Sequence, residues 1–170
     1  MKREVKYDNY PTWIVIISNF VSLSIYGLGF MILIQLGWII SILYLIFILF
    51  FEFRLISMHC VNCYYRGKTC GFGKGRISSL LFKKGDASRF CEKEMTWKNM
   101  IPDLLISLIP FTIGIIVLII KFDYRILFAL IILIVLTTIG NGFVRGTLTC
   151  RYCKQKDLGC PADKLFNKEK

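Results

Sequence analysis

Residues 13–51 read WIVIISNFVSLSIYGLGFMILIQLGWIISILYLIFILFF and contain no charged side chain. An α-helix rises about 1.5 Å per residue, so about 20 apolar residues are enough to cross a bilayer. This run of 39 residues is about twice as long as one crossing needs, and it must therefore fold back on itself. The bend is expected at Gln35-Leu36-Gly37, where a polar side chain and a flexible glycine interrupt the run.

Two further apolar runs follow in the second half of the chain, at residues 104–120 and 126–144. Together with the folded first run, they predict an all-α integral membrane protein with four transmembrane helices. The block behind Lys2, Arg3 and Lys6 is too long for a cleavable signal peptide, so we expect it to stay in the chain. The four spans are expected near residues 13–34, 37–53, 102–120 and 126–144.

The positive charges predict how these helices are oriented. The chain has 22 Lys and Arg, of which three lie in residues 1–12, ten in residues 54–100 and seven in residues 145–170. Because Lys and Arg are enriched in cytoplasmic loops, both termini and the central loop are expected on the cytoplasmic side of the cell membrane. Anionic lipid headgroups account for the net charge of +11, so we do not expect nucleic acid as a partner.

Two cysteine triplets of identical spacing indicate that the chain consists of two similar halves. Each triplet follows an apolar run, and two spans per half leave both halves in the same orientation, related by an axis along the membrane normal. We expect residues 1–90 and residues 91–170 each to form a helical hairpin followed by a cytoplasmic knuckle. Both knuckles read C-x2-C-x6-C, with Cys60, Cys63 and Cys70 in the first and Cys150, Cys153 and Cys160 in the second.

Cysteines two residues apart are typical of metal sites, because a short turn aims both sulfurs at one ion. The sequence therefore predicts zinc or an iron–sulfur cluster bound by the six cysteines. Neither triplet supplies four ligands, so three arrangements remain open. Cys91 can complete the first triplet while His59 serves the second, the two C-x2-C pairs can share one ion, or each triplet can bind a cluster with a further ligand.

Two other states of these thiols compete with metal binding. Disulfides can join Cys60 to Cys70 and Cys150 to Cys160, although thiols in a reducing cytoplasm are usually free or bound to metal. The thiols can also remain unbound and take part in redox exchange.

The segment after the first triplet has its own pattern. The glycine-rich residues 71–75 are expected to let the backbone wrap closely around the knuckle. Ile77, Leu80 and Leu81 follow at i, i+3 and i+4, which predicts a short amphipathic helix lying on the bilayer surface.

The sequence contains no catalytic triad, no H-E-x-x-H and no nucleotide-binding motif, which disfavours an enzyme. The leading hypothesis is a small multi-pass membrane metalloprotein that acts as a docking, assembly or regulatory subunit for a membrane or cytoplasmic protein partner. A membrane redox protein, active in electron transfer or thiol–disulfide exchange, is the first alternative. Handling of a soft metal is the second, although the expected spans contain only Met31 as a soft ligand.

Overall fold

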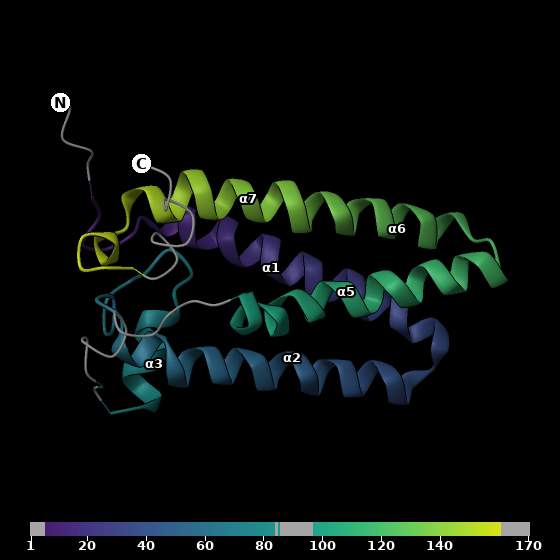
Figure 1. The fold of residues 1–170 in the computed structure, drawn as a ribbon, viewed down its shortest axis with the longest axis horizontal. Helices are drawn as coiled ribbons and strands as arrows, with labels where there is room; N and C mark the ends of the chain where they lie inside the picture. Colours follow the sequence, from purple (N-terminus) through teal and green to yellow (C-terminus); the bar gives the residue numbers. More distant parts are fainter. Residues whose placement is uncertain (1–5, 84, 86–96, 161–170) are drawn as a thin grey trace.

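The computed structural model of the chain describes residues 6–83, 85 and 97–160. All regular elements of these residues are helices. In addition, Tyr7 and Cys153 form one isolated parallel β-bridge among the described residues. The long helices lie side by side, and the short elements gather at one end of them (Figure 1). We call this end, formed by residues 59–83 and 149–160, the knuckle end.

The first apolar run forms a helical hairpin with its bend at the predicted position. Helix α1 spans Thr12–Leu33, a 3-10 turn follows at Ile34–Leu36, and α2 spans Trp38–Met58. Gly37 connects them with a φ of 124°, which favours glycine because other residues rarely adopt it. Helix α2 continues past its expected end at residue 53, because the charged side chain of Glu52 has partners within the fold and does not terminate the helix.

The second half forms a hairpin as well. Helix α5 spans Trp97–Ile120, and the Asp123 carboxylate then caps the next helix by accepting a hydrogen bond from the Arg125 backbone N–H at 2.8 Å. Both helices of this hairpin extend beyond the expected spans, because hydropathy marks the apolar part of a helix and not its ends. The last helical run consists of α6 (Tyr124–Val135), a π-helical turn (Leu136–Gly140), α7 (Asn141–Phe143) and a second π-helical turn (Val144–Thr149).

Helix α1 is the centre of the bundle and contacts α2, α5 and α6. Its Ile25 and Ile32 are 5% and 1% exposed, and they pack in one cluster with Leu130 and Leu133 of α6. On the opposite side, Tyr44 of α2 donates a hydrogen bond to the Ile106 carbonyl of α5 at 2.8 Å. The two hairpins are therefore joined through α1 and α5.

Three segments among the described residues are long and apolar enough to cross a membrane: Thr12–Leu36, Trp38–Asn62 and Tyr124–Tyr152. A shorter apolar stretch, Leu104–Ile120, lies within α5.

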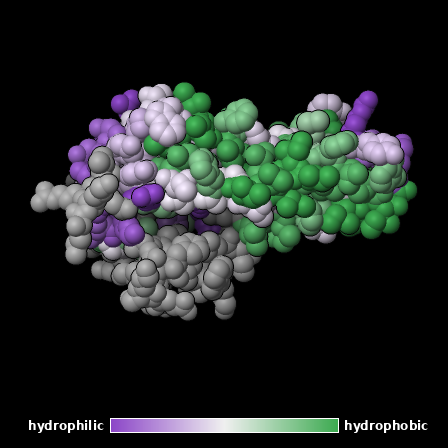
Figure 2. All heavy atoms as spheres, turned by 90° about the horizontal axis from the view of Figure 1, so that it is seen from above, coloured by the Kyte–Doolittle hydropathy of each residue, from purple (hydrophilic) through white to green (hydrophobic). Residues whose placement is uncertain are grey.

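The outer surface of the bundle is also apolar, since Ile39 and Ile119 are 77% and 79% exposed. Figure 2 shows one face of the molecule, on which hydrophobic side chains cover the length of the bundle and hydrophilic ones lie at its two ends, most of them at the knuckle end. An apolar surface of this extent is typical of a membrane protein.

Helix α3 (Lys74–Leu81) is the short helix predicted after the first triplet, although it begins earlier, at Lys74. It buries Gly75 and Ser78 against the knuckle, whereas Leu80 and Leu81 are 84% and 61% exposed. The apolar face of α3 thus points outward at the end of the bundle, as an interfacial helix requires.

Candidate site at the cysteine knuckles

The two cysteine knuckles, residues 60–70 and 150–160, begin with the same backbone turn. In each, the N–H of the second cysteine bonds the carbonyl of the first, at 3.4 Å for Cys63 and Cys60 and at 3.3 Å for Cys153 and Cys150. Cys63 has φ −82° and ψ 150°, and Cys153 has φ −81° and ψ 120°. Equal spacing in the sequence therefore corresponds to equal local conformation.

Hydrogen bonds join the two knuckles directly. The Tyr64 backbone N–H donates to Oε1 of Gln155 at 2.7 Å, and the Lys154 backbone N–H donates to the Tyr65 hydroxyl at 3.0 Å. Tyr65 and Gln155 are 2% and 3% exposed, so this joint excludes solvent. Buried polar groups need such partners, because an unpaired one is costly.

The segment before α1 reinforces this joint. The Tyr7 carbonyl accepts from the Tyr65 hydroxyl at 2.7 Å, while the Tyr7 N–H donates to the Tyr152 carbonyl at 3.2 Å. Tyr10 likewise connects both sides, since its N–H bonds the Thr69 carbonyl at 2.9 Å and its hydroxyl bonds the Thr149 carbonyl at 2.5 Å. Residues 7–10 therefore lie between the knuckles and tie them together.

Gly75 fulfils the expectation that glycines let the backbone wrap closely. A Cβ there would lie 2.2 Å from the Tyr65 carbonyl oxygen and 2.6 Å from that of Lys68. Gly71 brings the first knuckle against the end of the second hairpin, where a Cβ would lie 2.5 Å from Cγ2 of Thr149. A larger residue would push the backbones apart at Gly75 and displace the Thr149 side chain at Gly71.

Burial and neighbouring thiols keep Cys63 and Cys153 protonated. Burial, together with smaller effects of the nearby thiols of Cys153, Cys70 and Cys160, raises the pKa of Cys63 to about 11. Burial also raises the pKa of Cys153, with Cys150 and Cys160 acting in the same direction. In the absence of a metal, both sulfurs are therefore neutral at pH 7.

Backbone N–H groups oppose this effect and point at the sulfurs. Hydrogen bonds from the Tyr65 and Gln155 backbones lower the pKa values of Cys63 and Cys153, respectively. The Gly75 N–H donates to Sγ of Cys70 at 3.4 Å. Such N–H···S bonds favour the thiolate, which is the form that ligates a metal.

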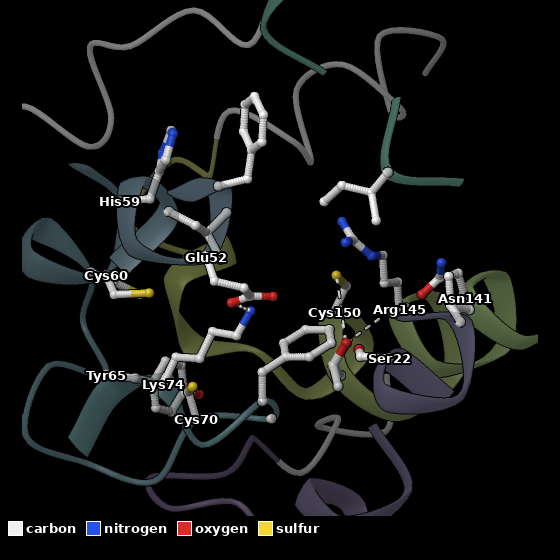
Figure 3. A pocket seen from close by; sticks show the side chains of 18 of the residues that line it. Ser22, Glu52, His59, Cys60, Tyr65, Cys70, Lys74, Asn141, Arg145 and Cys150 are labelled. Carbon is white, nitrogen blue, oxygen red and sulfur yellow. Dashed lines mark hydrogen bonds and ion pairs between the residues drawn. The ribbon is translucent and has the colours of Figure 1, made fainter. Parts of the chain in front are cut away.

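A cavity of about 650 Å³ lies at the knuckle end, between the hairpins. Its wall contains a network in which Lys74 Nζ contacts the Glu52 carboxylate at 2.5 Å and the Tyr26 hydroxyl donates to that carboxylate at 2.5 Å. No motif in the sequence indicates that Lys74 pairs with Glu52. Figure 3 shows Glu52, Lys74, Cys60 and Cys70 facing the same space.

The structure brings most of the predicted site residues to this cavity. They are His59, Cys60, Cys63, Cys70, Cys150 and Cys153. Cys160 lies close enough to influence the pKa values of Cys63 and Cys153. Cys91, the candidate additional ligand, lies outside the described residues.

Among the described residues the cysteines form neither a disulfide nor a preassembled metal site. None of the six described cysteines is in a disulfide, including the proposed pairs Cys60–Cys70 and Cys150–Cys160. Among these described residues, no three or more His, Cys, Asp or Glu side chains lie close enough together to hold a metal ion. Ligation would therefore require loss of the thiol protons and rotation of the side chains toward one point.

Comparison of the chain with family models, with curated proteins and with solved structures finds no match.

Proposed function

We propose that this protein is a four-span membrane metalloprotein in which the two knuckles together bind zinc or an iron–sulfur cluster. The observation that supports this proposal is the joint between the knuckles, which gathers sulfurs from both halves around one cavity. The N–H groups directed at Cys63, Cys70 and Cys153 would donate hydrogen bonds to the metal-bound sulfurs, as such groups do around metal thiolates.

The role proposed for the metal is structural. Tyr65 of the knuckle end packs with Tyr10 and Ile14 in a cluster of only three buried apolar side chains, which is a small core for two knuckles. A bound ion would fix the loops and present them as a rigid basic surface for a membrane or cytoplasmic protein partner. We therefore propose a docking, assembly or regulatory subunit in preference to an enzyme.

Thiol–disulfide exchange has less support than metal binding. The attacking species in that reaction is the thiolate, and burial keeps Cys63 and Cys153 protonated at pH 7. A metal ion, by contrast, displaces the thiol protons when it binds.

Anaerobic purification, metal analysis and an absorption spectrum test the proposal. We expect bound zinc in a colourless protein, or iron and sulfide in a brown one. Cys63→Ser and Cys153→Ser should each release the metal if both halves share it, whereas Cys91→Ser should leave the metal in place. Loss of metal from Cys91→Ser but not from Cys153→Ser would instead favour a site made from the first half alone. A protein that never contains metal would refute the metalloprotein proposal.

The four-span arrangement includes Leu104–Ile120 as the third crossing, with both termini in the cytoplasm. In a background without native thiols, Gln35→Cys should react with an impermeant maleimide outside intact cells, whereas Lys168→Cys should not. Labelling of Lys168→Cys from outside would contradict this topology. The proposed repeat further requires residues 13–63 and 102–153 to superpose about an axis along the membrane normal.

A further inference from the structure

A stripe of polar side chains on the last helical run faces the cavity. Thr137, Asn141, Arg145 and Thr149 all line it, at intervals of four residues. In a regular α-helix each step of four residues overshoots one turn by about 40°, so this set would spread around the helix. The π-helical turns Leu136–Gly140 and Val144–Thr149 accommodate more residues per turn and reduce this drift. The two wide turns therefore align the polar side chains on one side.

Among the described residues that line the cavity, Arg145 is the one charged side chain without an ion pair. The other described charged residues that line it, Glu52 and Lys74, neutralise each other in an ion pair at 2.5 Å. The Arg145 guanidinium lies 5.8 Å from the centre of the Phe72 ring, and no described carboxylate pairs with it. Figure 3 shows this side chain extending into the cavity next to Asn141 and Cys150. The described lining thus has a net charge of +1, which favours an anion.

The remainder of the cavity is suited to a hydrocarbon chain. Its volume of about 650 Å³ is in the range of ligand pockets. Helix α5 begins short of the knuckle end (Figure 1), and residues of α2 and of the last helical run line the cavity. The apolar lining side chains come from α1, α2, α5 and the loop before α3, and include Ile25, Phe51, Leu55, Phe72, Leu104 and Ile106.

We propose that this cavity binds a membrane lipid with an anionic phosphate headgroup. Arg145 would contact the phosphate through its planar guanidinium, which matches two phosphate oxygens, and Asn141 would add a hydrogen bond one turn away. The acyl chain would lie along the apolar wall, toward the hydrophobic surface of the bundle (Figure 2). A free anion would gain the contacts to the phosphate group but not the contact with the apolar wall. This inference does not depend on whether the thiols bind metal.

The test uses the full-length protein, purified in dodecylmaltoside and stripped of lipid. Native mass spectrometry would follow titration with palmitoyl-oleoyl phosphatidylglycerol, with phosphatidylcholine of the same chains and with inorganic phosphate. We expect one saturable phosphatidylglycerol site, weaker binding of the zwitterionic lipid, and inorganic phosphate that competes only at far higher concentration.

Arg145→Gln should reduce phosphatidylglycerol affinity about tenfold or more, because a charge-assisted bidentate contact is lost. Arg125→Gln is the matched control, since it removes the same charge at the opposite end of the same helical run. Asn141→Ala provides a second variant and should weaken binding by a smaller factor. Metal content should be unchanged in all three, which separates this result from any failure of the metal proposal.

Three outcomes would overturn the inference. The first is equal phosphatidylglycerol affinity in wild type, Arg145→Gln and Asn141→Ala. The second is an equal loss in Arg125→Gln, which would show a general effect of charge. The third is Arg145-dependent binding of inorganic phosphate without binding of phosphatidylglycerol, which would assign the site to a free anion.

Discussion

Replacing Tyr65 with phenylalanine should loosen the joint between the knuckles. The substitution keeps the buried ring and removes one hydroxyl, which accepts from the Lys154 N–H at 3.0 Å and donates to the Tyr7 carbonyl at 2.7 Å. Each hydrogen bond contributes about 1 kcal/mol, so the loss is about 2 kcal/mol. Because Tyr65 is 2% exposed, water cannot readily replace the hydroxyl. A loss of about 2 kcal/mol raises the equilibrium population of the open joint about 30-fold.

Alkylation of the buried thiols measures this opening. Cys63 and Cys153 pack against the cluster that contains Tyr65, so they should react mainly when the joint is open. Metal-free, reduced protein would receive timed pulses of iodoacetamide at pH 8, and peptide mass spectrometry would give the rate for each cysteine. We expect both rates to rise about 30-fold in Tyr65→Phe if opening precedes alkylation.

Tyr152→Phe is the matched control for this experiment. The Tyr152 ring lies 5.2 Å from that of Tyr7, and the described residues show no hydrogen bond to its hydroxyl. The same chemical change should therefore leave both alkylation rates near the wild-type values. A change of less than threefold in Tyr65→Phe, or an equal rise in Tyr152→Phe, would refute the reasoning.

Two further predictions concern the same end of the molecule. Gly75→Ala should lower the free energy of unfolding by about 1–3 kcal/mol, because its Cβ would meet the carbonyl oxygens of Tyr65 and Lys68, whereas Gly27→Ala, with nothing within 4 Å, should be neutral or stabilising. Thermal unfolding in detergent measures both, and equal shifts would contradict the prediction. Burial raises the pKa of Cys63 from 9.0 to about 11. The neutral thiol should therefore contribute to the free energy of unfolding of the metal-free protein below pH 9, and this contribution should be lost between pH 9 and 11. Between pH 9 and 11, the thermal unfolding midpoint should fall less steeply with pH in Cys63→Ala than in the wild type. Equal slopes in the two proteins would contradict the prediction that Cys63 is a buried neutral thiol.

The parts of the fold that depend on local sequence could be predicted from it. The absence of charge over residues 13–51 required a hairpin, and Gly37 marked its bend, which the structure places at that residue. The equal C-x2-C spacings also correspond to equal turns at Cys60 and Cys150. Helix ends were less predictable, since α2 continues to Met58 once its Glu52 is paired inside the fold.

The candidate site was only partly accessible to sequence reasoning. A site shared by both C-x2-C pairs was one of three arrangements left open by the sequence. Cysteines from both triplets do line one cavity, although their role as metal ligands stays a prediction. The residues that join the knuckles gave no such signal. Tyr7, Tyr65 and Gln155 belong to no motif, and a tyrosine or glutamine near a membrane is usually interpreted as an interfacial side chain.

Sequence alone determined which segments are helical, where they turn and which thiols share a spacing, because these features depend on residues within a few positions of each other. Only the tertiary structure decided which side chains meet, as Tyr65 does with Lys154, 89 positions away. Hydropathy cannot supply this information in a membrane protein. Lipid is as apolar as a leucine side chain, so lipid-facing and helix-facing residues look alike in the sequence. The pairing of helix faces, and with it the cavity beside Arg145, therefore emerges only from packing and from the polar contacts at the knuckle end.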